Sequence, residues 1–142
     1  MLAQLAVGAG ASICSITVHS FMMAAVLKVA RFHAGISRYS SASLSWTMSS
    51  VMCVLMAAHT LEVMIWALIY TIIEVAPAGS NLLYFAFVNY TTLGYGDIMP
   101  VESWRLLGPV AAMNGILLFG WSTAVIFEVL RRTLIRMDEI AH

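Results

Sequence analysis

Long apolar runs alternate with short polar breaks along the chain, at a spacing that matches helices crossing a membrane. No Lys, Arg, Asp or Glu occurs between Met1 and Leu27, and the segments 46–73 and 106–130 are also mostly apolar. A membrane-spanning helix needs about 20 predominantly apolar residues, so each run is long enough. The pattern therefore predicts three transmembrane helices, the first at roughly residues 5–30.

The breaks between these runs differ in kind. The first, residues 31–45, is rich in serine and basic residues and predicts a polar linker. The second contains Pro77 and Gly79, which punctuate the backbone. After it, Ser80 or Asn81 can cap a helix that is too short to cross the bilayer.

A short apolar helix at 81–91 followed by a glycine-rich stretch indicates a re-entrant loop. Irregular backbone at membrane depth is tolerated only where it is buried in protein or lines a wet cavity. Small residues in the first run, Gly8 and Gly10, suit close packing of that helix against another.

Composition supports a membrane protein. Of the 142 residues, 61% are hydrophobic and only 10% charged, with a mean hydropathy of +0.90, whereas soluble domains carry about 25% charged residues. The formal net charge is zero, which gives no support to a nucleic-acid partner. Cys14 and Cys53 lie inside apolar runs and are interpreted as small buried hydrophobes. A cleaved signal peptide is disfavoured because the first basic residue, Lys28, follows the apolar run.

Basic residues predict the orientation, because Lys and Arg accumulate on the cytoplasmic side. Six of the seven fall either between the first two spans or after the third, and only Arg105 falls on the other side. The six are Lys28, Arg31, Arg38, Arg131, Arg132 and Arg136. We therefore expect a multi-pass plasma-membrane protein with the linker and C-terminus in the cytoplasm, and the N-terminus and loop outside.

The stretch from Thr91 to Asp97 reads TTLGYGD and has no hydrophobic periodicity. Glycines at alternate positions allow φ > 0 at every second residue. A strand of this kind can turn successive carbonyl oxygens to the same side, where they are good ligands for a dehydrated cation. Burying such oxygens without a partner is costly.

This stretch resembles the potassium-channel filter, Thr-Val-Gly-Tyr-Gly-Asp, with Leu93 at the usual valine position. The likeness covers roughly residues 46–132 and is typical of the small prokaryotic potassium channels, with one extra N-terminal helix. It implies an all-α integral membrane protein with three transmembrane helices and a re-entrant pore loop per chain, assembled as a homotetramer. The implied segments are an N-terminal helix (1–30), a cytoplasmic linker (31–45), an outer helix (46–73), a pore helix (81–91), a filter (92–97), an inner helix (106–132) and a short cytoplasmic tail (133–142).

The resemblance also implies roles for individual residues. The permeant K⁺ ions would be bound by the carbonyls of Thr92, Leu93, Gly94 and Tyr95, with the Thr92 hydroxyl as the innermost ligand. Filter support and the outer mouth would come from Gly96, Asp97, Tyr84 and Phe85, of which the aromatic residues would form a cuff with Tyr95. Gating and the cavity would involve Gly115, Ile116, Phe119, Thr123 and Asn114.

Two of these roles have competing interpretations. Gly115 matches the family's hinge glycine, but it can equally serve helix packing, as can Gly120. Asn114 can face the pore or hydrogen-bond a neighbouring helix, and the second is favoured. Val88 stands where some relatives have a buried acidic partner for Asp97, so this partner is expected to be missing.

His59 and Glu62 are spaced i, i+3 in the second span and share one helix face. Ionisable residues inside a membrane are functional candidates, as a metal pair or a pH sensor. The favoured interpretation is a structural pair, hydrogen-bonded to each other or to another helix, since no second His or carboxylate pair accompanies them.

The expected function is passive, selective K⁺ permeation, without enzymatic turnover and without an organic cofactor. The expected partners are further copies of the chain and the lipid bilayer. The first span lacks the repeated arginines of a voltage sensor. The alternatives are a weakly selective cation channel, since Leu93 and the missing acid could loosen the filter, a membrane enzyme or metal carrier built on His59 and Glu62, and a non-conducting subunit.

Overall fold

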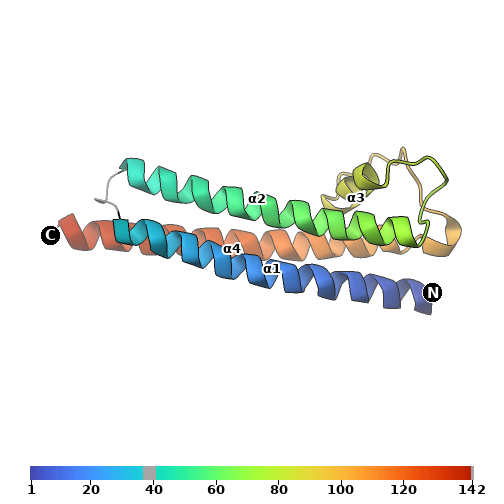
Figure 1. Ribbon diagram of the computed structural model, residues 1–142, viewed down its shortest axis with the longest axis horizontal. Coiled ribbons are helices and arrows are strands. Elements are labelled where there is room, and N and C mark those ends of the chain that lie inside the picture. Colours follow the sequence, from blue (N-terminus) through green and yellow to red (C-terminus); the bar gives the residue numbers. More distant parts are fainter. Residues whose placement is uncertain (37–40, 142) are drawn as a thin grey trace.

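Three long helices run alongside one another, and a short helix packs near one end of them (Figure 1). The computed structural model describes residues 1–36 and 41–141, with side chains described for 1–32 and 42–137. The elements are α1 (Leu2–Ile36), α2 (Ser41–Ile72), α3 (Leu82–Tyr90), a 3₁₀ turn (Glu102–Trp104) and α4 (Leu107–Ala141).

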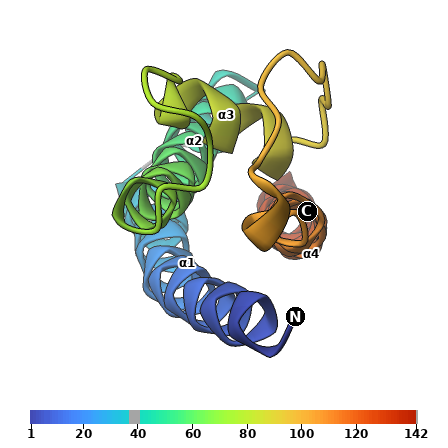
Figure 2. The same cartoon turned by 90° about the vertical axis from the view of Figure 1, so that its right-hand side faces the viewer.

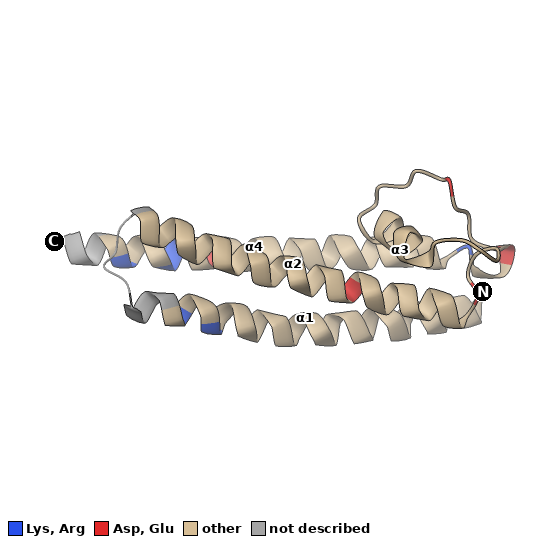
Figure 3. Ribbon diagram, turned by 45° about the horizontal axis from the view of Figure 1, so that its top comes forward, with Lys and Arg blue, Asp and Glu red and all other residues tan. Residues whose placement is uncertain are grey.

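The three long helices are apolar enough to cross a membrane, over 2–32, 42–72 and 102–137. The N-terminus lies at the same end as α3 and its loops, and the C-terminus lies at the opposite end (Figure 1). Most of the described Lys and Arg residues lie towards the C-terminal end of the helices (Figure 3). The expected all-helical architecture with three apolar helices of membrane-spanning length is therefore confirmed.

The helices extend further than the polar residues suggested. The linker expected at 31–45 is largely helical, because α1 continues to Ile36 and α2 begins at Ser41. Residues 37–40, including Arg38, lie outside the described part of the chain. Likewise α4 continues to Ala141 through most of the tail expected at 133–142. Arg and Ser mark where a helix leaves the apolar core of a membrane, but they do not by themselves end its backbone hydrogen bonding.

Helix α1 packs against both α2 and α4, and α3 packs against the same two helices. Viewed end-on, α1 and α3 lie on opposite sides of the α2–α4 pair (Figure 2). The close approach of α1 to α4 uses Gly8, where an added Cβ would lie 3.0 Å from Val110 Cγ1, whereas Gly10 has nothing within 4 Å. The Gln4 side chain also accepts a hydrogen bond of 3.0 Å from the backbone N–H of Leu106, immediately before α4. The N-terminal helix is thus fastened to the start of α4.

The main apolar core lies around α3. It contains large buried aromatic side chains, among them Trp66 and Tyr70 from α2 and Phe85 and Tyr90 from α3. A second, smaller core of Met23, Val26, Val51, Leu55 and Val129 joins the other ends of the three long helices. Because the larger core holds α3 in place, it also fixes the position at which the filter-like stretch begins.

Candidate functional site

Helix α3 is a short, capped helix, and the cap is one of the two foreseen in the sequence. The Asn81 side chain accepts a hydrogen bond of 3.1 Å from the backbone N–H of Tyr84. At the other end, the backbone N–H and hydroxyl of Thr91 both donate to the carbonyl of Phe87, at 3.0 and 2.7 Å. The predicted range of 81–91 agrees with Leu82–Tyr90 to within a residue at each end.

The backbone after α3 has a left-handed φ at every second residue. The values are +61° at Thr92, +63° at Gly94 and +75° at Gly96. The two glycines behave as their alternation predicted. Thr92 was not foreseen, because a β-branched residue with φ > 0 is an outlier that no local sequence signal announces.

The backbone N–H groups at the start of the filter-like stretch donate hydrogen bonds to α3. The carbonyls of the stretch itself do not take part in these bonds. The N–H groups of Thr92 and Leu93 donate to the carbonyls of Asn89 and Val88, at 3.0 and 2.9 Å. Within the described part of the chain, the carbonyls of residues 92–95 accept no hydrogen bond. The side chains of Leu93 and Tyr95 are 54% and 67% exposed, so this stretch lies on the outside of a single chain.

At the end of this stretch, Asp97 has a hydroxyl partner in place of an acid. The Tyr84 hydroxyl donates a hydrogen bond to the Asp97 carboxylate, which raises the pKa of that hydroxyl and keeps it protonated. Val88, at the position where an acidic partner for Asp97 was expected to be missing, is buried. Phe85 is buried against Tyr70, with ring centroids 5.4 Å apart, and so braces α3 from inside the chain.

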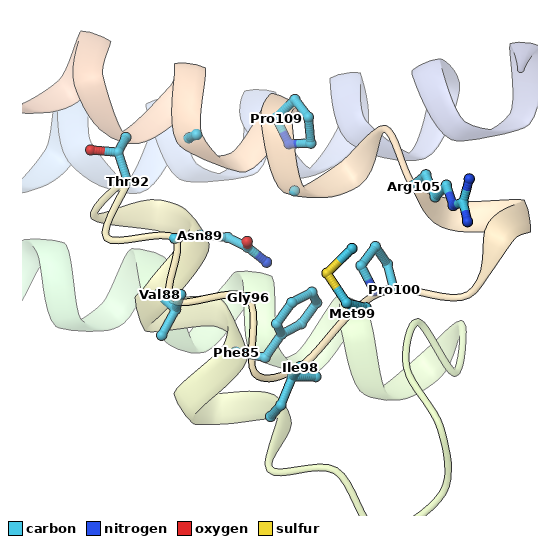
Figure 4. Close-up of a pocket in the computed structure, with 13 residues that line it drawn as sticks. Phe85, Val88, Asn89, Thr92, Gly96, Ile98, Met99, Pro100, Arg105 and Pro109 are labelled. Carbon is cyan, nitrogen blue, oxygen red and sulfur yellow. The ribbon is translucent and has the colours of Figure 1, made fainter.

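A cavity of about 490 Å³ lies between the segment 98–100, which follows the filter-like stretch, and the start of α4 (Figure 4). Its lining is mostly apolar and includes Phe85, Ile98 and Pro109. The half-buried side chain of Asn89 also lines it. The segment 98–100 therefore leaves an open space beside α4, although Ile98 itself packs against the core that contains Leu107 and Ala111.

Helix α4 passes directly behind the end of α3. A Cβ added at Gly115 would lie 2.0 Å from the carbonyl oxygen of Tyr90, whereas one at Gly120 would have nothing within 4 Å. Asn114 is buried and accepts a hydrogen bond of 3.2 Å from the Trp66 indole, which bridges α4 to α2. The side chains proposed to line a cavity, Ile116, Phe119 and Thr123, are on exposed parts of α4.

His59 and Glu62 hydrogen-bond to each other and to other helices, as the favoured interpretation expected, but a second histidine does accompany them. His19 from α1 lies with its Nδ1 2.7 Å from Glu62 Oε1, while His59 Nδ1 lies 2.9 Å from Glu62 Oε2. The Tyr90 hydroxyl also donates to Glu62, and Ser122 lies 3.0 Å from His59 Nε2. Sequence reasoning missed His19, Tyr90 and Ser122. A histidine inside an otherwise uncharged span was the available signal for His19.

Comparison with known proteins agrees with this arrangement. The profile of a family described as ion channel matches residues 58–132, which is more than half of the 142 residues. The match takes in the C-terminal part of α2 (residues 58–72), all of α3, the filter-like stretch and α4 as far as Arg132. The comparisons with curated proteins and with solved structures gave no match. Since the profile covers more than half of the chain, the chain belongs to the ion channel family.

Proposed function

We propose that the protein is a potassium-selective channel in which four copies surround one filter of backbone carbonyls. The observation that carries this proposal is the alternating left-handed backbone at Thr92, Gly94 and Gly96, beside carbonyls that accept no hydrogen bond in the described part of the chain. A permeating K⁺ ion has to exchange its hydration shell for other oxygens, and a ring of such carbonyls can supply them. The ion sites would be formed by residues 92–95, with the Thr92 hydroxyl innermost.

The need for several copies follows from the exposure of the filter-like stretch. One chain contributes one strand, so a closed ring of oxygens requires a symmetric assembly, and four loops build the filter that this stretch resembles. In such an assembly the exposed Leu93 and Tyr95 side chains would turn towards neighbouring copies. Lipid would cover the apolar outer faces of the long helices.

Electrostatics favour a cation along this path. The C-terminal end of α3 carries the negative end of the helix dipole and would face an ion in the cavity beneath the filter. The Asp97 carboxylates would form an anionic ring at the outer mouth, where they concentrate cations. The basic ends of α1 and α4 would lie in the cytoplasm, which places the N-terminus and filter outside. Ile116, Phe119 and Thr123 would line the inner cavity, and Gly115 would set where α4 can move.

The test is the reversal potential of purified protein in planar bilayers, with K⁺ on one side and Na⁺ on the other. Selective permeation predicts a reversal potential close to the K⁺ equilibrium value. A reversal potential near zero would instead identify a weakly selective cation channel, to which Leu93 would contribute by widening the filter. Absence of current at protein densities at which assembled particles are present would mean that the protein is a non-conducting subunit.

A further inference from the structure

A polar cluster lies inside the helix bundle at the level where α3 ends, and it joins all four α-helices. Its members are His19 (α1), His59 and Glu62 (α2), Tyr90 (α3) and Ser122 (α4). His19 and Glu62 have 0% exposed side chains, and His59 only 13%. Ionisable groups inside a membrane protein are expensive to bury, so a cluster of three points to a function.

The three ionisable residues converge as a set of metal ligands. One nitrogen from each imidazole and one carboxylate oxygen all lie within 4.8 Å of one another. Tetrahedral Zn²⁺, with bonds of about 2.0–2.2 Å to such ligands, needs them about 3.3 Å apart. His19 Nδ1 lies 2.7 Å from Glu62 Oε1 and His59 Nδ1 lies 2.9 Å from Glu62 Oε2, so both contacts are shorter than an ion between the groups requires. Small side-chain rotations would therefore open the site to an ion.

Residues around these three hold them in a ligating orientation. Ser122 Oγ lies 3.0 Å from His59 Nε2, which directs Nδ1 of that ring towards Glu62. The Tyr90 hydroxyl donates to the Glu62 carboxylate and fixes its rotation. Outer hydrogen bonds of this kind set the tautomer and direction of the ligands in metal sites.

Charge also favours a bound cation. Within the described part of the chain, Glu62 forms no ion pair with Lys or Arg, and both of its ion-pair partners are histidines. His19 Nε2 is buried without a hydrogen-bond partner among the described residues, so this nitrogen is available to ligate an ion. An imidazole ligates a metal ion through its unprotonated nitrogen.

We propose that His19, His59 and Glu62 form a binding site for a divalent transition metal ion of the Zn²⁺ class. Two imidazoles and one carboxylate suit such an ion better than they suit Mg²⁺ or Ca²⁺, which take oxygen ligands. The bound ion would tie α1 to α2 directly beside Tyr90, the last residue of α3. The site goes beyond K⁺ permeation and does not depend on it.

The test measures metal on the full-length protein, purified without a histidine tag, stripped with chelator and then given Zn²⁺ or Co²⁺. We expect one Zn²⁺ per chain by elemental analysis, and a visible absorption band of tetrahedral Co²⁺. Both should be lost in His19→Gln and in Glu62→Gln. Ser122→Ala, which removes an outer hydrogen bond, should weaken affinity by about tenfold.

Two further variants separate ligation from folding. His33→Gln removes another histidine of α1 and should keep full metal content, whereas His19→Cys supplies a new metal ligand and should restore the binding that His19→Gln loses. Metal below stoichiometric amounts in the wild type would overturn the proposal. So would equal metal content in the wild type and in His19→Gln. Neither readout uses ion flux, so failure here leaves the proposed channel function standing, and the reverse also holds.

Discussion

At the scale of single residues, Gly94 carries the clearest conformational demand. Its φ is +63°, and the nearest atom to an added Cβ is the Thr92 carbonyl oxygen at 3.9 Å. Space is therefore available for a methyl group, but the backbone conformation is unfavourable for it by about 1–2 kcal/mol. We expect Gly94→Ala to rotate a carbonyl out of the filter in every copy and to abolish K⁺ efflux from loaded vesicles.

Gly120→Ala is the matched control for this substitution. Gly120 lies within α4, and an added Cβ would have nothing within 4 Å. Its replacement should preserve efflux at equal protein density. Efflux that persists undiminished in Gly94→Ala would remove the filter assignment.

Features that depend on neighbouring residues could be predicted from the sequence, whereas contacts between distant residues could not. Asn81 as a cap and the alternating Gly94 and Gly96 are local signals, and the structure has both. The contact between His19 and Glu62 joins residues 43 positions apart and exists only because α1 and α2 pack together. The local signal was a histidine inside an otherwise uncharged span, and that signal could not identify its partner on α2.

At the scale of elements, the crossing of α4 behind α3 depends on Gly115. An added Cβ there would lie 2.0 Å from the backbone oxygen of Tyr90, which cannot move without shifting the end of α3. Forcing extra volume into such a contact costs about 1–3 kcal/mol or more. We expect Gly115→Ala to lower the melting temperature of the detergent-solubilised protein and to reduce K⁺ efflux.

Gly120→Ala again serves as the comparison, since it adds the same methyl group to the same helix without a contact. It should melt at or slightly above the wild-type temperature, because alanine favours a helix over glycine by about 1 kcal/mol. Should Gly115→Ala melt like the wild type while its flux changes, the glycine would act as a hinge and not as a packing contact.

Element ends were less predictable than element identities. The apolar runs located three spans correctly, but α1 and α4 continue past their basic residues to Ile36 and Ala141. Hydropathy reports where a helix leaves lipid, whereas backbone hydrogen bonding decides where it stops. The polar break at Pro77 and Gly79 did separate α2 from α3, because Pro and Gly act on the backbone itself.

At the scale of the whole molecule, one chain has the features of an incomplete structure. The stretch from Thr91 to Asp97 is exposed throughout. A cavity of about 490 Å³ lies between the segment that follows this stretch, residues 98–100, and α4. Carbonyls of residues 92–95 accept no hydrogen bond within the described part of the chain. With further copies around a common axis, these oxygens could bind one ion together, and neighbouring chains would cover the exposed stretch.

Sharing of one filter can be measured by mixing chains. If four copies contribute to each filter and one Gly94→Ala copy suffices to disable it, equal amounts of variant and wild type leave about one sixteenth of the flux, by random assembly. Filters shared by two copies would leave about one quarter, and independent chains about one half. The measurement is K⁺ efflux from vesicles at constant total protein, over a series of mixing ratios.

The mixing experiment depends on the two kinds of chain assembling together, which an affinity tag on the variant alone can verify. Wild-type chains should be recovered with the tagged variant in proportion to their abundance, because the substitution lies at φ +63° with open space around it and leaves the helix contacts intact. Efflux should then fall as the fourth power of the wild-type fraction. A linear fall despite co-recovery would mean that each chain conducts on its own, and the exposed filter-like stretch would then need another explanation than a shared axis.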